Sequence, residues 1–283
     1  MKHKKLEIPE ILHGKRADTA ISELLGNEFS RNQVKDLIKS GDILINDEQC
    51  KPKDRVCHND QIHVSIPDAE VSSWTGEDIN LDVIFSCDDY VIINKPAGLV
   101  MHPGAGVKSG TLANAVATMY PEVLSLPRNG IVHRLDKDTS GLVVIARNNG
   151  FRNHIAEQFQ NRKVEKKYLA VIKGEILGAL TIDKSIARDR QNRTKMKVDE
   201  SGREAVSEVI SLESFGGYSL VEVKIETGRT HQIRVHLSSN KTPIIGDKAH
   251  GSGSQLIKNL SNNLKDKILS FQRQALHAYH LAF

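Results

Sequence analysis

The stretch of residues 130–147, GIVHRLDKDTSGLVVIAR, constrains the fold of this chain more than any other. It begins as a polar loop, passes through a Thr-Ser-Gly turn signal and ends in the apolar run 142–146. That run has the length and the β-branched content of a buried strand. The stretch therefore predicts a loop followed by a strand in the core of a sheet.

The polar loop carries a candidate reactive group, Asp136. A lone Asp in a loop is usually a cap or a turn residue, but a loop held against a rigid strand also presents catalytic side chains. Arg134 lies two residues before Asp136. A nearby cation favours the ionised carboxylate that a nucleophile or a base needs at neutral pH. The spacing therefore makes Asp136 a candidate catalytic residue.

Composition places the chain among globular proteins. It has 283 residues, enough for one large domain or two smaller ones, with 39% hydrophobic and 26% charged residues. No apolar run is long enough to cross a bilayer, and residues 1–9 are basic without the apolar core of a signal peptide. The three cysteines form no CxxC pair. We therefore expect a cytoplasmic protein in a reducing compartment, without a membrane partner.

Charge is unevenly spread over a chain whose net charge is +4. Residues 1–75 hold 11 Lys and Arg against 13 Asp and Glu, whereas residues 134–203 hold 16 against 9. A basic surplus beside a candidate active site favours a polyanionic substrate, because phosphate contacts supply most nucleic-acid affinity. A solvated, lysine-rich face would give the same counts, so charge alone leaves both interpretations open.

Residues 14–67 have the pattern of a small module. The expected elements are two helices, 17–25 and 31–39, and two strands, 43–46 and 61–66. Ser30 is a suitable N-cap for the second helix, and Gly41 is a suitable end for it. The module is followed by small and acidic residues at 68–80 that are typical of a linker.

The second predicted helix carries a basic stripe. Arg31, Lys35 and Lys39 repeat every four residues and share one face. The order of elements resembles the αL RNA-binding motif of ribosomal proteins and tyrosyl-tRNA synthetases, in which this stripe would face RNA. An ordinary amphipathic helix with a solvated basic side is the alternative. We take the three residues as candidate RNA-binding residues of a domain that spans 14–75.

From residue 81 onward, short strands and helices alternate without a regular βαβ rhythm. This favours an α+β fold with a mixed sheet. Helices are expected at 111–120, 151–161 and 230–238, and strands at 90–94, 142–146, 168–173, 219–226 and 275–283. Residues 250–267 are rich in Gly, Ser, Asn and Lys and have the composition of an exposed insertion.

A second group of polar residues lies at 226–237, ETGRTHQIRVHL. A strand is expected to end at Gly228 and a helix to begin at Thr230, whose hydroxyl could cap it. Arg229 then lies just before a helix N-terminus, where guanidinium and helix dipole both favour an anion. That anion could be a phosphate or the carboxylate of Asp136. A structural Arg at a strand end is the alternative.

The motifs indicate neither a metal nor a nucleotide cofactor. His231 and His236 are five residues apart, which does not match a metal pair on one helix face. The order Gly-Val-Lys-Ser within residues 102–111 lacks the adjacent Gly-Lys of a P-loop, so nucleoside triphosphate binding is not expected. The glycines there are suited to a tight turn.

Tyr168 is a candidate for stacking on a base. Alternation within the predicted strand puts it on the same face as Ala170 and Ile172. Its ring could stack on a nucleobase while the phenol serves as a polar group. A tyrosine in the core of the sheet is the alternative.

Five motifs occur in a consistent order over nearly the whole chain. They are INKPAGLVMHPGAG at 93–106, GIVHRLDKDTSGLVVIAR at 130–147, KKYLAVIKGEI at 166–176, ETGRTHQIRVHL at 226–237 and RQALHAYHL at 273–281. Together they resemble the RluA family of pseudouridine synthases, and most of all its members that act on the large ribosomal subunit. The resemblance implies a catalytic domain over 81–283 with a mixed, mainly antiparallel sheet.

The resemblance also implies roles for single residues. Asp136 matches the catalytic aspartate, Tyr168 the tyrosine that contacts the target uracil, and Arg229 the arginine that pairs with the aspartate. Arg134, with its neighbour His133, is implied to bind the flipped nucleotide and its backbone. The implied reaction isomerises specific uridines of 23S ribosomal RNA to pseudouridine without a cofactor. The implied partner is large-subunit RNA or its assembly precursors, bound by a monomer.

Other functions stay open at this point. A non-catalytic rRNA-binding assembly factor could keep the same fold, and a related synthase could act on another RNA. A base-excising glycosidase would want a second carboxylate to activate water, and no motif supplies one. Relatives continue past the LHAxxL segment, so we expect a chain truncated at its C-terminus relative to the family.

Overall fold

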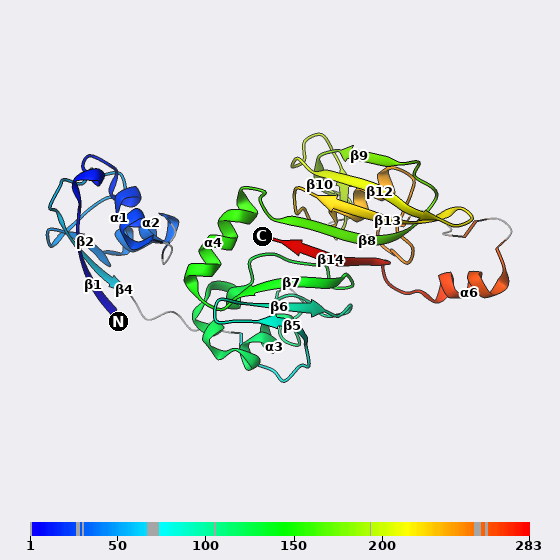
Figure 1. The fold of residues 1–283 in the computed structure, drawn as a ribbon, viewed down its shortest axis with the longest axis horizontal. Helices are drawn as coiled ribbons and strands as arrows, with labels where there is room; N and C mark the ends of the chain where they lie inside the picture. Colours follow the sequence, from blue (N-terminus) through cyan, green and yellow to red (C-terminus); the bar gives the residue numbers. More distant parts are fainter. Residues whose placement is uncertain are drawn as a thin grey trace.

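The computed structural model describes residues 2–26, 29, 31–66, 74–104, 106–192, 194–251, 256–257 and 260–283. Its elements enclose two large, separate hydrophobic cores, one within the first 66 residues and one from residue 81 onward (Figure 1). Both groups combine helices with a sheet, which confirms the predicted α+β class.

The first group is a four-stranded sheet covered by two helices. Its elements are β1 (Lys2–Glu7), η1 (Glu10–Leu12), α1 (Ala17–Leu25), α2 (Arg31–Ser40), β2 (Ile43–Ile45), β3 (Glu48–Gln49) and β4 (Gln61–Ile66). The strands pair antiparallel in the order β1-β4-β2-β3. α2 ends at Gly41, whose φ of 83° suits glycine. The predicted cap Ser30 lies outside the described residues.

The second group is built on an eight-stranded sheet. Its helices are α3 (Leu112–Met119), η3 (Pro121–Ser125), η4 (Pro127–Gly130), α4 (Asn149–Gln160), α5 (Gln232–Ser239) and α6 (Asn262–Ser270). Its strands are β5 (Asp82–Ser86), β6 (Tyr90–Lys95), β7 (Ser140–Ala146), β8 (Glu165–Lys173), β9 (Ala179–Asp183), β10 (Ile186–Arg188), β11 (Met196–Val198), β12 (Val206–Ser214), β13 (Tyr218–Ile225) and β14 (Leu276–Ala282).

The large sheet has the strand order β5-β6-β7-β14-β8-β13-β12-β9, while β10 and β11 pair separately. Neighbouring strands are antiparallel except β7 and β14, which are parallel. The sheet is therefore mixed and mainly antiparallel, as predicted. The order also shows that the C-terminal strand β14 is inserted in the middle of the sheet, between β7 and β8 (Figure 1).

The parallel pair at the centre of the sheet brings distant segments together. Ala278 of β14 lies opposite Gly141 of β7 on one side and opposite Tyr168 of β8 on the other. Gly141 has a φ of 121°, and a Cβ at this position would clash with the carbonyl oxygen of Ala278. Glycine is thus required for the close approach, which places the loop before β7 near Tyr168.

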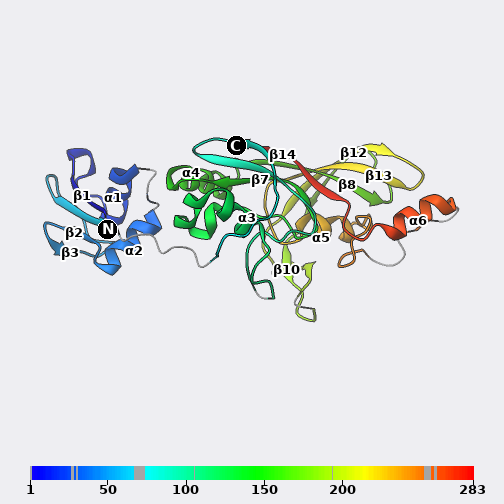
Figure 2. The same cartoon turned by 90° about the horizontal axis from the view of Figure 1, so that it is seen from below.

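Helix α5 begins two residues later than predicted. Its N-cap is His231, in a left-handed conformation with φ 56°, and not Thr230. The side chain of Gln232 accepts hydrogen bonds from Thr227 Oγ1 (2.7 Å) and the Arg229 backbone N–H (3.0 Å), which fixes the turn between β13 and the helix. Figure 2 shows α5 on one side of the sheet, where its apolar residues join the main core.

Several elements were not predicted from the sequence. They include β9 and β12 at one edge of the large sheet and the separately paired strands β10 and β11. Helix α6 overlaps the end of the segment 250–267 expected to be an exposed insertion, and none of its residues is buried. β9, β10 and β11 are only three to five residues long, and a run of that length gives little periodic signal.

Candidate active site

A buried lysine, Lys95, binds the loop that carries Asp136. Lys95 is fully buried, and its Nζ donates hydrogen bonds to the carbonyl oxygens of Pro96 (2.8 Å), Leu99 (2.9 Å) and Lys137 (3.0 Å). Burial lowers the pKa of Lys95 to about 8, although the charges of nearby aspartates oppose the shift. The lysine therefore ties the loop after β6 to the residue that follows Asp136. Sequence analysis did not single it out.

A second contact fixes the other end of this loop. The backbone N–H of Thr139 donates to the carbonyl oxygen of Asp136 (3.1 Å), which closes a turn. The side-chain N–H of Gln274, just before β14, donates to Thr139 Oγ1 (3.0 Å). The position of Asp136 is thus set by segments about 40 and 140 residues away in the sequence.

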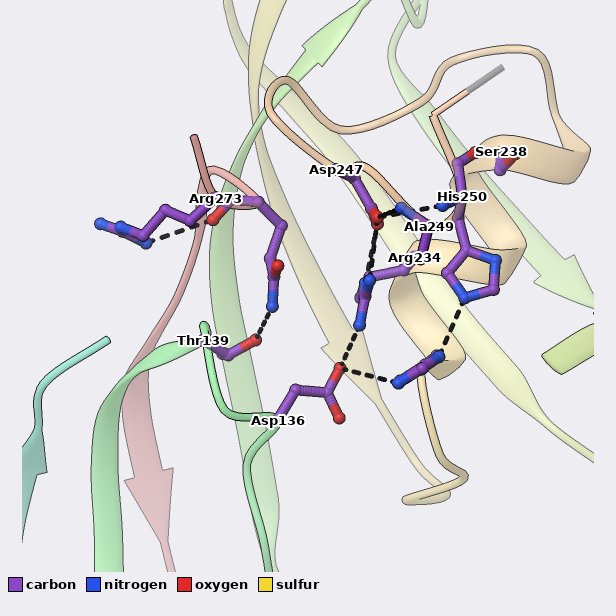
Figure 3. A network of polar contacts seen from close by, with 10 residues as sticks. Asp136, Thr139, Arg234, Ser238, Asp247, Ala249, His250 and Arg273 are labelled. Atoms are coloured by element: carbon purple, nitrogen blue, oxygen red, sulfur yellow. Dashed lines mark hydrogen bonds and ion pairs between the residues drawn. The ribbon is translucent and has the colours of Figure 1, made fainter. Parts of the chain in front are cut away.

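Asp136 is paired with Arg234, which lies in the first turn of α5 (Figure 3). Arg234 Nη1 donates to Asp136 Oδ2 at 2.9 Å. The other side of the guanidinium holds Asp247 with two hydrogen bonds, Nε to Oδ2 at 2.7 Å and Nη2 to Oδ1 at 2.8 Å. This bidentate contact fixes the plane of the guanidinium and so the direction from which it meets Asp136.

Asp247 is itself a well-satisfied carboxylate. Its Oδ1 also accepts the backbone N–H groups of Ala249 (2.9 Å) and His250 (3.0 Å). Burial alone would raise the pKa of Asp247, but the hydrogen bonds and charge of Arg234 outweigh it, so the pKa lies below its usual value. Asp247 therefore anchors Arg234 as an anion. Sequence analysis missed it, because nothing in the run IIGDKAH indicates a partner.

The predicted pairing of Arg229 with Asp136 is wrong. Arg229 Nε donates to the backbone carbonyl of Glu204 (3.0 Å), and Arg234 takes the place beside the aspartate. The backbone N–H of Arg229 is bound by the Gln232 side chain, and its guanidinium is held by Glu204. Arg234 is buried in α5, and a buried cation requires an anionic partner, but its burial is set by the fold and could not be predicted from the sequence.

A histidine pair lies on the other side of Asp136. His231 Nε2 is 3.9 Å from Asp136 Oδ2, and a hydrogen bond of 2.9 Å joins His231 Nδ1 to His250 Nε2. Burial lowers the pKa of His231, against the opposing charge of Asp136, and lowers that of His250 to about 4. Both rings are therefore neutral near pH 7. Asp136 Oδ1 has no hydrogen bond within the described part of the chain, so this oxygen is available for chemistry.

Tyr168 is a core residue, as the alternative interpretation had it, and it also lines the pocket where a base could stack. It is buried on β8 and packs in the main core, yet its ring lines the pocket beside Asp136. That pocket holds a volume of about 70 Å3 and is also lined by Arg134, Arg229 and His231. Burial, reinforced by the charge of Asp136, raises the pKa of the Tyr168 phenol, which therefore stays protonated.

His133 and Arg134 differ in their surroundings. His133 Nε2 accepts the backbone N–H of Val144 (3.0 Å), and its ring stacks on Phe159 with centroids 4.9 Å apart. Burial lowers the pKa of His133 to about 3, so it is neutral. Arg134 is exposed on the pocket wall and forms no ion pair with Asp136. Arg134 is therefore not in contact with Asp136, and Arg234 is the cation that binds it.

The basic stripe on α2 is only partly open to a ligand. Arg31 Nη2 donates hydrogen bonds to both carboxylate oxygens of Asp18, to Oδ1 at 3.1 Å and to Oδ2 at 3.2 Å. Lys39 lies 3.9 Å from Asp36, and Lys35 forms no ion pair among the described residues. Arg31 thus has a structural contact that sequence analysis did not foresee, while the two lysines remain exposed.

No cluster of three or more His, Cys, Asp or Glu side chains could hold a metal ion in the ranges that the structure describes. In the same ranges, no helix has the length and apolar content needed to span a membrane.

Comparison with protein families gives two matches. A family described as RNA pseudouridylate synthase matches residues 89–239, which include the Asp136 loop, β8 and α5. The S4 domain matches residues 16–62, which include α1, α2 and part of β4.

Similar proteins carry one name. The ribosomal large subunit pseudouridine synthase D of Xanthomonas campestris pv. campestris is 41% identical over 276 residues, covering 98% of this chain and 83% of that protein. The protein of the same name from Escherichia coli K12 is 38% identical, covering 94% and 81%. The solved structure of human RNA pseudouridylate synthase domain containing 1 has a TM-score of 0.57 and 26% identity, covering 73% and 79%. The predicted likeness to large-subunit synthases is confirmed.

Proposed function

The chain belongs to the RNA pseudouridylate synthase family, and on that premise we propose that it converts specific uridines of large-subunit ribosomal RNA to pseudouridine. The observation that carries the proposal is the pairing of Asp136 with a cation fixed by Asp247, beside a pocket lined by Tyr168. The choice of RNA is supported by the two relatives named as large-subunit synthases.

The reaction is an isomerisation of one nucleotide. The bond between uracil N1 and ribose C1′ breaks, the uracil turns in the pocket, and C5 forms the new bond to C1′. The proton displaced from C5 is lost and N1 gains a proton, so atoms and electrons balance without an oxidant or an external nucleophile. The pocket must therefore hold a free uracil close to the ribose.

Asp136 begins this exchange at the ribose. A carboxylate can attack C1′ or remove a proton from the sugar, and both roles require an ionised oxygen. Arg234 binds Oδ2 and orients the group, which leaves Oδ1 directed at the substrate. Because Asp247 fixes Arg234, the carboxylate needs little reorganisation when the substrate enters.

Tyr168 supports the base once it has left its stack. Extruding a nucleotide from a helix costs a few kcal/mol, and an aromatic face in the pocket offsets part of that cost. The raised pKa of its phenol keeps the hydroxyl as a hydrogen-bond donor throughout the neutral range.

The test is a map of pseudouridines in ribosomal RNA from cells with and without this protein. We expect specific sites in the large-subunit RNA to revert to uridine without it, to return with the wild-type chain, and to stay absent with Asp136→Asn. Identical maps in the presence and absence of the protein would overturn the proposal. If pseudouridines were lost from another class of RNA instead, that RNA would be the substrate, and the proposed isomerisation would stand.

The non-catalytic assembly factor is disfavoured by the complete set of Asp136, Arg234 and Tyr168 around one pocket. We also infer that the chain acts in the cytoplasm as a monomer, on large-subunit RNA or its assembly precursors, with a catalytic domain at 81–283. The N-terminal domain was predicted at 14–75, but β1 pairs with β4, so the proposed domain begins at β1. Sedimentation with large-subunit precursors and the mass of the purified chain in solution test these points.

A further inference from the structure

A groove with a volume of about 830 Å3 adjoins the catalytic pocket. Arg134, Tyr168 and Arg229 line both spaces, so the groove and the pocket are continuous. The groove continues to Trp74 and His102, which do not line the pocket. Neither of these two residues has a role in the isomerisation described above.

Trp74 is fixed in the groove wall by hydrogen bonds from the residues after it. The side-chain N–H of buried Asn114, in the first turn of α3, donates to the carbonyl oxygen of Thr75 (2.7 Å). The backbone N–H of Glu77 donates to the carbonyl oxygen of the same Asn114 (3.1 Å). A Cβ at Gly76 would approach Thr118 Oγ1 to 2.5 Å, so this segment lies directly on α3.

His102 and Arg128 are anchored to the same turn of α3. The backbone N–H of Ala113 donates to the carbonyl oxygen of Met101 (3.0 Å), and the Asn129 side chain donates to the carbonyl oxygen of Ala113 (3.1 Å). Arg128 has a left-handed φ of 56°, which non-glycine residues rarely adopt. Three separate segments therefore converge on α3, and each supplies a side chain to the groove.

The two rings form an aromatic platform. Trp74 and His102 are nearly parallel, with an interplanar angle of 13° and ring centroids 5.7 Å apart, which is an offset stack. Both side chains are half-buried. Because each ring covers part of one face of the other, a base would stack on an outer face of this pair, and any base could do so because every base has a π-face.

Cations line the same groove. Arg128, Arg134, Lys166 and Arg229 face it, and none of the four forms an ion pair with a carboxylate in the described part of the chain. Glu226 is the acidic residue among the lining residues. The groove thus joins a stacking surface to a set of unpaired positive charges, the combination that binds single-stranded nucleic acid.

We propose that this groove binds an unpaired nucleotide flanking the target uridine, whose base stacks on the platform of Trp74 and His102. The phosphates on either side of that nucleotide contact Arg128, Arg134 and Lys166. The proposal rests on RNA being the substrate, and it adds that the chain selects a target whose neighbour is free to leave its stack. Stacking makes this a choice of RNA shape, tolerant of which base is bound.

The first test uses the single tryptophan of the chain as a direct probe. A large-subunit ribosomal RNA transcript is titrated into the Asp136→Asn protein, which should bind without turnover. We expect the fluorescence of Trp74 to be quenched at the concentrations at which RNA binds. RNA binding without any change in this fluorescence would overturn the platform.

The second test couples the protein residue to one RNA base. In the shortest rRNA fragment that the wild-type chain converts, each nucleotide beside the target is replaced in turn by an abasic one. One replacement should weaken binding to the wild-type chain about tenfold, as expected for a lost base stack. The same replacement should change binding to Trp74→Ala less than twofold. Equal losses in both proteins at every position would refute the contact.

Two control variants separate stacking from folding. Trp74 also packs against the main core, as Ile79 does in the same segment, but Ile79 does not line the groove. Ile79→Ala should keep the response to the abasic nucleotide, and Trp74→Phe should keep most of it. If the wild-type chain converts no ribosomal RNA at all, the proposed function fails; if conversion is normal and Trp74→Ala shows the full abasic effect, only this inference fails.

Discussion

Two aspartate–arginine clusters in this molecule have opposite compositions. In the N-terminal module, the Asp18 side chain is 4% exposed and lies between Arg16 and Arg31, which are 46% and 54% exposed. In the active site, the Arg234 side chain is 9% exposed and lies between Asp247, at 1%, and Asp136, at 18%. One cluster surrounds a carboxylate with two cations, and the other divides one cation between two carboxylates.

The difference shows what each cluster can do. Asp18 has its pKa lowered to about 2, chiefly by the hydrogen bond from Arg16 and then that from Arg31 against the effect of burial, so its bonds are already made. Asp136 receives one hydrogen bond from Arg234, whose other side is committed to Asp247. A carboxylate satisfied on all sides stabilises a fold, whereas one oriented through a single oxygen retains an oxygen for a substrate.

The largest effect should come from Asp136→Asn. The amide keeps the shape of the side chain but cannot act as a nucleophile or a base, so isomerisation should fall below one per cent of wild type (~100-fold or more). Affinity for the RNA should stay within a few-fold, because many cations share the phosphate contacts. Turnover measured by pseudouridine formation in vitro, next to a filter-binding titration, checks both. Turnover at a few per cent of wild type would assign the chemistry to another group.

The next effect compares two arginines, Arg234→Gln and Arg229→Gln. Arg234→Gln should lower kcat by about 10²- to 10³-fold, as expected for loss of a preorganised charged partner, and should also lower thermal stability because Asp247 is left buried and unpaired. Arg229→Gln loses only a contact to a backbone carbonyl, so kcat should fall less than tenfold. Arg234→Lys should restore part of kcat if charge matters beyond folding. A larger loss from Arg229→Gln would reverse the assignment.

These two arginines also show how much of the site could be predicted from the sequence. The strand after the Asp136 loop, the strand of Tyr168 and a helix after Arg229 are all predicted from patterns within about ten residues. Local spacing cannot tell which of two arginines five residues apart faces the aspartate. The difference lies in the turn after β13, where Gln232 binds Thr227 and the Arg229 backbone and α5 begins at Gln232 itself.

The remaining site residues could not be predicted from local sequence patterns either, because the fold brings them together from distant segments. Asp247 lies 111 residues after Asp136 in sequence, and only the fold places both against Arg234. Lys95 has no periodic signal, because its role is to bind three carbonyl oxygens from two loops. Insertion of β14 between β7 and β8 is likewise a long-range event that no local rule predicts.

Variants of Tyr168 can separate its packing in the core from its contribution to turnover. Tyr168→Phe keeps the ring in the core and the stacking face, so stability should change by less than ~1 kcal/mol while kcat falls about fivefold, the value of one hydrogen bond. Tyr168→Ala removes both and should cost ~3–5 kcal/mol of stability as well as turnover. The free energy of chemical unfolding and kcat of the two variants test these expectations. Similar, near-wild-type rates for both would leave Tyr168 a core residue only.

Asp18→Asn should affect stability and leave catalysis unchanged. The folded pKa of about 2 lies below the ordinary value of 3.8, so the contribution is complete above about pH 4 and is lost as pH falls toward 2. We expect a loss of ~1 kcal/mol at pH 7, limited by the half-exposed arginines, and no difference from wild type near pH 2. Asp36→Asn, at an exposed position of the same module, is the matched control. A constant difference at every pH would mean that packing, and not charge, stabilises this site.

The smallest effect should come from the two lysines of the α2 stripe. Arg31 is engaged by Asp18, so the exposed Lys35 and Lys39 are the stripe residues that can meet phosphates, although Lys39 also lies 3.9 Å from Asp36. The double variant Lys35→Ala and Lys39→Ala should weaken RNA binding a few-fold and reduce the slope of log K against log salt by about 1.5, with turnover at saturating RNA unchanged. The control replaces Lys51 and Lys53, exposed lysines outside the stripe, and should leave the slope as it is. Equal slopes for both double variants would show that α2 is an amphipathic helix with a solvated basic side and no RNA face.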